Sequence, residues 1–248
     1  MRPAVRALTA LARTETTLFL RDPTGVLIGV FMPTAILVAL GSVPALREPS
    51  ATFGGLRFVD YFAPPLLAVS IAVLGLQSLP IGLVTYREKG VLRRMSATPL
   101  RPWAVLLVQL LVNLGTVAVA TGLMVAVAVL GLGVPFPRHP LGFAVTFVVG
   151  TSAVFAIGLL IAALVPRAKL ANGIGTIGFM ALLFFGGVYL PKFLLPEVVV
   201  RIGEFVPPGI EAFADSWTGE GPVPLQLAVL AAIAVVTTGV AARLFRWE

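Results

Sequence analysis

One short charged segment lies between two long stretches without any charge, and this pattern constrains the fold more than any other feature of the sequence. The segment is YREKGVLRRMSATPLRP, residues 86–102. No Asp, Glu, Lys or Arg occurs from Tyr61 to Tyr86 or from Pro102 to Pro137. About 20 apolar residues are enough to cross a bilayer. Each flanking stretch is therefore long enough to be a membrane span, and the charged segment must lie in water between them.

The composition supports a membrane protein. Of the 248 residues, 58% are hydrophobic and 12% are charged, whereas about 25% are charged in a typical soluble domain. We therefore predict an all-α polytopic membrane protein. The chain has no Cys and a single His, His139, so we expect no metal or cofactor bound by this chain. The net charge of +7 reflects Lys and Arg that alternate with apolar stretches, and we expect no nucleic-acid partner.

The apolar stretches predict six transmembrane helices within one membrane domain, residues 1–248. None of the six contains Asp, Glu, Lys, Arg or His. Each charged residue at mid-bilayer costs about 2.5–3.5 kcal/mol on insertion scales, which explains their absence. The predicted spans are Thr24–Pro44, Tyr61–Thr85, Trp103–Leu132, Leu141–Val165, Leu170–Leu190 and Val223–Ala242.

Lys and Arg are distributed unequally between the two sides of these spans. With a cytoplasmic N-terminus, thirteen of the eighteen lie on the cytoplasmic side and five lie outside. Cytoplasmic loops carry an excess of Lys and Arg, so we predict that both termini are cytoplasmic. The thirteen are Arg2, Arg6, Arg13, Arg21, Arg87, Lys89, Arg93, Arg94, Arg101, Arg167, Lys169, Arg243 and Arg246, and the five are Arg47, Arg57, Arg138, Lys192 and Arg201.

Residues 1–22 predict an amphipathic helix lying in the cytoplasmic interface of the membrane. At about 100° per residue, apolar side chains gather on one arc and arginines on another. Glu15 falls on the apolar arc and interrupts the pattern. The alternative is a solvated basic tail. The apolar arc holds Val5, Leu8, Leu11, Ala12, Leu18 and Phe19, and the basic arc holds Arg2, Arg6 and Arg13.

Residues 191–222, between the fifth and sixth predicted spans, are too charged to cross the membrane. Pro196 suits the first turn of a helix, and apolar residues follow it from Val198 to Val206. We predict an outer pair of short helices that is either re-entrant or lies on the membrane surface.

The chain lacks the motifs of several functional classes. It contains no G-x-x-x-x-G-K-[ST] sequence to cradle the phosphates of ATP, and no ionisable residue within a span of the kind that ion-coupled transporters use. No catalytic constellation appears, so we do not expect an enzyme. Three classes stay open: a transport subunit driven by a partner, a stand-alone facilitator or channel, and a membrane-embedded enzyme or assembly scaffold.

A few polar and aromatic residues within the spans have two interpretations. Lipid offers no hydrogen-bond partner, so we expect Gln77, Asn113 and Asn172 to bond between helices. The alternative is that Gln77 or Asn172 faces a translocation path. Three phenylalanines near the end of the fifth span either pack against other helices and lipid or contact an apolar substrate. The candidate path residues are Gln77, Asn172, Phe179, Phe184 and Phe185.

The charged segment resembles a motif of the type-2 ATP-binding cassette exporters, in their membrane-spanning permease subunit. These are the drug and polysaccharide exporter permeases, including daunorubicin-resistance-like proteins. The family pattern is R-E-x-G-x-L-x-x-L-x-x-T-P. The matching residues are Arg87, Glu88, Gly90, Leu92, Thr98 and Pro99, with Met95 where Leu is common. The resemblance extends to the N-terminal helix, the six spans and the prolines of the outer loop, and so covers nearly the whole chain.

This resemblance implies a short cytoplasmic coupling helix, from Glu88 to Ala97, that docks on a separate nucleotide-binding subunit. That partner would bind ATP and magnesium. A second permease subunit, identical or different, would complete the transporter in the bacterial inner membrane. The implied cargo is a hydrophobic drug or a lipid-linked glycan. The implied coupling residues are Arg87, Glu88, Lys89, Gly90, Leu92, Arg93, Arg94 and Met95.

Overall fold

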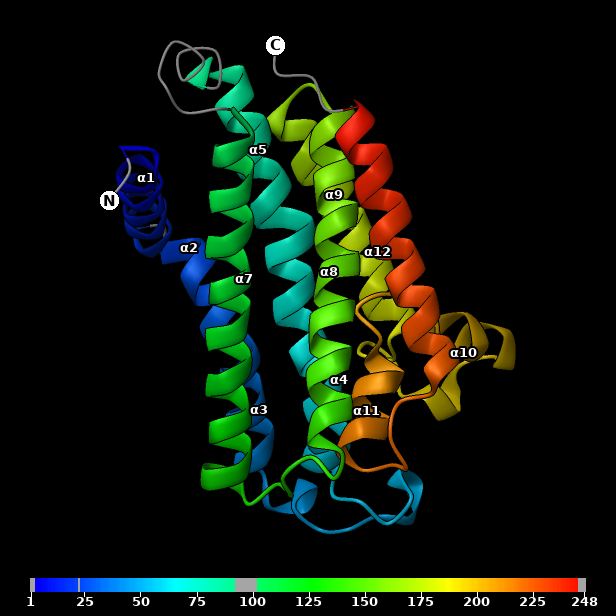
Figure 1. Ribbon diagram of the computed structural model, residues 1–248. Coiled ribbons are helices and arrows are strands. Elements are labelled where there is room, and N and C mark those ends of the chain that lie inside the picture. Colours follow the sequence, from blue (N-terminus) through cyan, green and yellow to red (C-terminus); the bar gives the residue numbers. More distant parts are fainter. Residues whose placement is uncertain (1–2, 22, 92–101, 245–248) are drawn as a thin grey trace.

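A computed structural model describes residues 3–21, 23–91 and 102–244 (Figure 1). These residues form helices joined by short loops, with an isolated bridge between Pro49 and Arg57 and no strand within the described ranges. Five helices are long and apolar enough to cross a membrane: Phe58–Glu88, Leu107–Gly131, Pro140–Leu164, Ala168–Phe185 and Pro224–Leu244. The predicted all-α polytopic fold is therefore confirmed.

The second predicted span is the central helix of the bundle. It consists of α4 (Phe58–Ala72), the π-helical η4 (Val73–Ser78) and α5 (Leu79–Glu88). Of its most apolar stretch of 18 residues, 78% is buried, whereas at most 44% of the corresponding stretch is buried in the other four long helices. At about 1.5 Å per residue the 31 residues extend about 46 Å. This length exceeds the roughly 30 Å hydrocarbon core, so the helix must project beyond the core.

The other long helices pack on two sides of this central helix (Figure 1). On one side lies α7 (Pro102–Ala126), continued by η5 (Val127–Gly131). On the other side, α8 (Pro140–Leu164) runs along α12 (Pro224–Leu244), and α9 (Ala168–Phe185) packs on η4 and α5. Strings of Leu, Val and Ala without charges form these helices because only apolar side chains are stable against both lipid and the buried core.

The first predicted span, Thr24–Pro44, is shorter in the structure. It comprises α2 (Pro23–Val26), η1 (Leu27–Phe31) and α3 (Met32–Ser42), and only Leu27–Ser42 forms an apolar helix, which is below the length of a span. The helix ends before Pro44 because a residue that precedes proline avoids the α conformation. Val43 is accordingly extended, with φ −82° and ψ 117°.

Two other predicted boundaries are wrong by several residues. The fifth span ends at Phe185 rather than Leu190, because Gly186 and Gly187 turn the chain and Gly187 has a φ of +73°. The predicted separate helix starting at Glu88 is also wrong at its start. Glu88 is the last residue of α5, and the turn that follows ends at Gly90, whose φ of +63° is a left-handed conformation that glycine adopts without strain.

The bundle has two distinct ends. We call one the loop end: it holds α1 (Pro3–Leu20), the end of α5, the start of α7, the turn from α8 to α9, and the end of α12 (Figure 1). We call the other the hairpin end, after α10 (Glu197–Gly203) and α11 (Ile210–Trp217). The short 3₁₀ helices η2 (Pro44–Leu46), η3 (Ala51–Phe53) and η6 (Lys192–Leu194) also lie there.

The helix α11 is inserted into the bundle instead of lying on it. It packs against α4 and α8, and its residues Ile210, Phe213 and Trp217 are buried. The backbone before it also approaches α8 closely, since a Cβ added at Gly150 would lie 2.0 Å from the Pro208 carbonyl oxygen. A charged segment with one apolar face thus fills the space between two long helices.

Candidate functional site

The loop end contains a buried polar contact that joins three helices. Glu15 of α1 is 8% exposed, and its carboxylate accepts a hydrogen bond from the Tyr86 hydroxyl of α5 at 2.8 Å. The Gln109 amide of α7 donates to the other carboxylate oxygen at 3.5 Å. The position of Glu15 on the apolar arc of residues 1–22 is therefore no defect in the amphipathic pattern. It lets the N-terminal helix bind the central helix.

Arg87 lies one residue further along the central helix and binds the end of α8. Its Nη1 donates to the Ala162 carbonyl oxygen at 3.1 Å, and its Nη2 donates to the Val165 carbonyl oxygen. The last four carbonyls of an α-helix have no partner within the helix. A guanidinium is also attracted to the negative end of the helix dipole.

Glu88 binds the next helix, α9. Its Oε1 accepts a hydrogen bond from the backbone N–H of Ala168, the first residue of α9, at 3.2 Å. A carboxylate is favourable at the N-terminus of a helix, where N–H groups lack partners. Arg87 and Glu88 thus contact the two sides of one turn, residues 165–167, with opposite charges.

The remaining predicted coupling residues fall into two groups. Lys89 and Gly90 form the turn after α5, where their N–H groups donate to the carbonyls of Thr85 and Arg87, each at 3.0 Å. The other four lie outside the described residues: Leu92, Arg93, Arg94 and Met95.

The candidate path residues Gln77 and Asn172 lie on two elements that pack together, η4 and α9. Gln77 is half-buried and Asn172 is exposed. The expected interhelical bond of Asn113 is not observed, because its Nδ2 donates to the Gln109 carbonyl of the same helix at 2.9 Å. Of the two α7 amides, Asn113 and Gln109, it is Gln109 that bonds to another helix, through Glu15 of α1.

The three predicted phenylalanines of α9 point to different surroundings. Phe179 packs against the buried core, and Phe184 is 39% exposed. Phe185 lines an apolar groove of about 600 Å³, which η4, α8, α9 and residues 206–207 enclose. Leu76 and Ile177 line the same groove. Of the three rings, Phe185 is therefore the one that lines this groove.

Glycines let α8 and α9 touch the backbone of the π-helical segment η4. A Cβ added at Gly158 would lie 2.0 Å from the Gly75 carbonyl oxygen, and one at Gly175 would lie 2.1 Å from the Leu76 carbonyl oxygen. π-helical turns occur frequently at functional sites. Here the two glycines bring the helices that enclose the groove into direct contact with such a turn.

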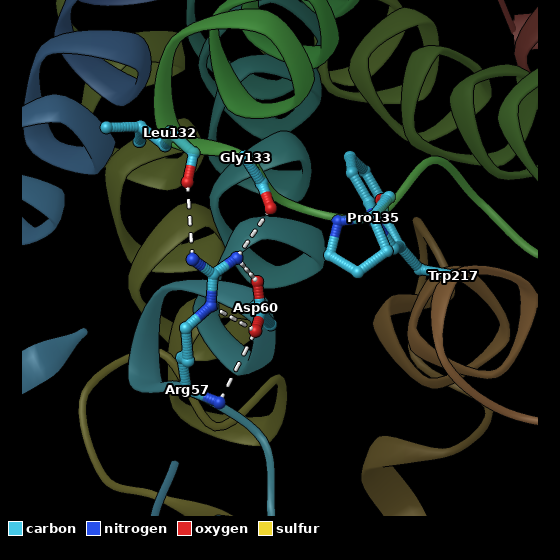
Figure 2. A network of polar contacts seen from close by, with 6 residues as sticks. All are labelled: Arg57, Asp60, Leu132, Gly133, Pro135 and Trp217. Carbon is cyan, nitrogen blue, oxygen red and sulfur yellow. Dashed lines mark hydrogen bonds and ion pairs between the residues drawn. The ribbon is translucent and has the colours of Figure 1, made fainter. Parts of the chain in front are cut away.

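The hairpin end is held by an arginine that binds both a carboxylate and a neighbouring loop (Figure 2). Arg57 pairs with Asp60 through Nη2 at 2.7 Å and Nε at 2.8 Å. It also donates to the carbonyl oxygens of Leu132 at 3.3 Å and Gly133 at 2.8 Å. The bound carboxylate raises the pKa of the Arg57 guanidinium. The Trp217 indole donates to the Pro135 carbonyl oxygen at 2.7 Å, which fixes the same loop to α11.

A second charged group at the hairpin end surrounds Lys192. Its ammonium forms an ion pair with Glu211, and its side chain is 24% exposed. Burial lowers the pKa of Lys192 to about 8, although the charges of Asp215 and Glu204 act in the opposite direction. Burial also raises the pKa of Asp215. Across the described ranges, His, Asp and Glu form no group of three that could hold a metal ion.

Glu15, Tyr86 and Gln109 could not be recognised as partners of one another from the sequence, because they lie far apart in the chain. Two features of the sequence indicated buried polar contacts: the carboxylate of Glu15 on an apolar helix face, and the amide of Gln109 within a span. Neither observation identifies which helix supplies the partner.

A comparison with protein families matches residues 6–208, the greater part of the chain, to the ABC-2 type transporter. A search of curated proteins finds no match. The matched region includes most of α1, the central helix, the Arg87–Glu88 dipeptide and the α8–α9 turn. The chain is thus a multi-pass transport subunit, and it belongs to the ABC-2 type transporter family.

Proposed function

We propose that this chain is the membrane subunit of an exporter that a separate ATPase subunit drives. The match of residues 6–208 to the ABC-2 type transporter carries the proposal. The sequence contains no phosphate-binding G-x-x-x-x-G-K-[ST] motif, so ATP and magnesium bind in the partner. This chain supplies the path and the partner supplies the energy.

The ATPase docks at the loop end, on the segment of residues 86–102. Arg93 and Arg94 pair with acidic groups of the partner, and Leu92 and Met95 contribute apolar contact. The central helix supports this assignment because it connects the segment to the hairpin end without interruption. A displacement of this segment by the ATPase is therefore transmitted along the buried central helix.

The loop end faces the cytoplasm of a bacterial cell, and the chain crosses the inner membrane six times. The excess of Lys and Arg on this side supports the orientation. Besides the five long helices, α2, η1 and α3 near the start of the chain make one more crossing. Their 20 residues extend about 30 Å at 1.5 Å per residue. In Figure 1, α1 and the end of α12 lie at the same end of the bundle, which supports an even number of crossings.

Two copies of this membrane subunit, or this chain and a related one, enclose the substrate path. The groove with Phe185 supports a path beside α9, because its lining is apolar and it is open to the outer surface of the subunit. Ile177 of α9 is 70% exposed. Gln77, Asn172, Phe179 and Phe184 lie on the elements that border the groove and complete the path. Its chemistry suits a hydrophobic drug-like molecule or a lipid-linked glycan.

Purification of the chain from its native membrane in mild detergent tests the proposal. We expect an ATPase to copurify and the preparation to hydrolyse ATP in a vanadate-sensitive manner. The alternative function is an ATPase-independent facilitator or channel. It would be favoured if the purified chain moved solute down a gradient across liposomes with no ATPase present.

A further inference from the structure

We infer that Arg87 and Glu88 are positioning residues that cap α8 and α9, and thereby make the α8–α9 turn move with the end of α5. The inference rests on the proposed function only for its role in coupling. The sequence resemblance gives these two residues a different task, direct docking on the ATPase.

The N-terminus of α9 needs a hydrogen-bond acceptor that the residue before the helix does not provide. The residue before the helix is Arg167, which makes no side-chain capping bond. Arginine has no acceptor atom, so it cannot satisfy the N–H groups of the first turn. The carboxylate of Glu88 binds the Ala168 N–H at 3.2 Å and takes the place of a local N-cap.

The C-terminus of α8 needs hydrogen-bond donors for its last carbonyl oxygens. Ala162 belongs to its last turn, and Val165 follows its last residue, Leu164. Arg87 donates to the carbonyl oxygens of both residues. A cation at a helix C-terminus and an anion at a helix N-terminus are both favourable in the field of the helix dipole. One dipeptide therefore satisfies two helix ends, and only residues 165–167 separate them.

The consequence is a mechanical connection from the loop end to the groove. The residues that follow Glu88 lead into the segment that we assign to the ATPase. Through Glu88, a displacement of α5 acts on α9, which carries Ile177 and Phe185 of the groove. In this arrangement the charges of Arg87 and Glu88 face the membrane subunit itself.

Hydrogen exchange of the full chain in lipid nanodiscs, without any ATPase, tests the capping. In Glu88→Ala, we expect the amides of residues 168–171 to exchange about fivefold faster, the effect of losing about 1 kcal/mol of capping. Glu88→Gln keeps an acceptor oxygen and should stay near the wild-type rate. Unchanged exchange in Glu88→Ala, or equally fast exchange in both variants, would overturn the inference.

Ala168→Pro provides a second variant that leaves the carboxylate in place. Proline is well tolerated at the first position of a helix, and the extended Arg167, with φ −127° and ψ 137°, suits a residue before proline. Because proline has no N–H, adding Glu88→Ala should not accelerate exchange at residues 169–171 any further. A further acceleration would mean that Glu88 acts elsewhere. This comparison also holds if Glu88→Ala alone loosens the whole bundle.

The coupling role is tested in the complex with the ATPase. The chain has no cysteine, so Ile177→Cys gives a single labelling site in the groove. We expect ATP and vanadate to change its labelling rate, and Ala168→Pro to abolish this change without lowering the amount of ATPase that copurifies. Loss of the ATPase in Glu88→Ala but not in Ala168→Pro would instead assign Glu88 to direct docking. If no ATPase accompanies the wild type, the proposed function fails while the exchange result stands.

Discussion

The Tyr86 hydroxyl donates a 2.8 Å hydrogen bond to the carboxylate of Glu15, although the two residues are 71 positions apart. The bond connects α1 to the last turn of the central helix. Glu15 is 8% exposed, so its carboxylate has little access to water and depends on protein partners. The N-terminal helix therefore binds the residue of α5 that directly precedes the Arg87–Glu88 dipeptide.

Tyr86→Phe removes the closest partner of this carboxylate. We expect a loss of about 1–3 kcal/mol in the free energy of unfolding, the cost of leaving a buried acceptor unsatisfied. Glu15→Gln should cost less, since a neutral amide keeps an acceptor for Tyr86 and removes a buried charge. Unfolding in detergent measures both changes. Equal stability of Tyr86→Phe and wild type would show that the bond does not hold α1.

Gly175→Ala tests the contact between α9 and η4. The added Cβ would lie 2.1 Å from the Leu76 carbonyl oxygen, so the backbone must move, at a cost of about 1–3 kcal/mol. Gly173→Ala is the matched control, because open space surrounds that position in the same helix. We expect the control to be neutral or slightly stabilising. Thermal unfolding of the two variants compares them, and equal melting temperatures would contradict the close packing.

Arg57→Lys should destabilise the hairpin end almost as much as Arg57→Ala. Lysine offers one compact ammonium, whereas Arg57 bonds Asp60, Leu132 and Gly133 at once. We expect each variant to lose about 2–3 kcal/mol, typical of hydrogen bonds to charged groups.

The control for Arg57 is Arg201→Ala. Arg201 pairs with Glu197 on the surface of α10, where both side chains are more than 70% exposed. Surface pairs of this kind contribute little to stability, so its melting temperature should stay near that of the wild type. Full stability of Arg57→Lys would show that charge alone, without the forked geometry, holds the loop.

Lys192 should titrate near pH 8 in the folded protein. Acetylation of its amine across a pH series measures this value, and half-maximal reactivity above pH 10 would contradict it. Burial lowers the pKa of Lys192 from 10.5 to about 8.

The sign of the linked stability change follows from proton binding. Between about pH 8 and 10.5 the unfolded chain keeps the Lys192 proton and the folded chain loses it, so this group stabilises the fold as the pH rises. The contribution is fully present above pH 10.5 and is lost as the pH falls through 8. Lys192→Met should remove this part of the pH dependence in unfolding experiments.

The long apolar helices were predictable because lipid allows few solutions. A polar residue or an unpaired backbone group is too costly in hydrocarbon, so charge-free stretches such as 102–137 identify spans directly. The end of α3 at Ser42 depends on one local effect, the proline at position 44, and the early end of α9 depends on Gly187. Such turns move a boundary without changing the apolar pattern.

The polar contacts were not predictable from the pattern. Glu15 looked like an exception on an apolar face, and its meaning depends on Tyr86 and Gln109 from other helices. The family resemblance assigned Arg87 and Glu88 to coupling with a nucleotide-binding subunit. Their partners are backbone groups of α8 and α9, which any sequence offers, so no residue type at those positions indicates the contact.

The most direct test of the ATP-driven account is a photo-crosslinking amino acid at position 89, in the turn after α5, with position 138 at the hairpin end as the control. Cells carrying either variant would be irradiated, and the adducts identified by mass spectrometry. We predict that position 89 crosslinks to a soluble ATPase with a phosphate-binding loop and that position 138 does not. Absence of any ATPase adduct at position 89, or its appearance at position 138, would contradict the account.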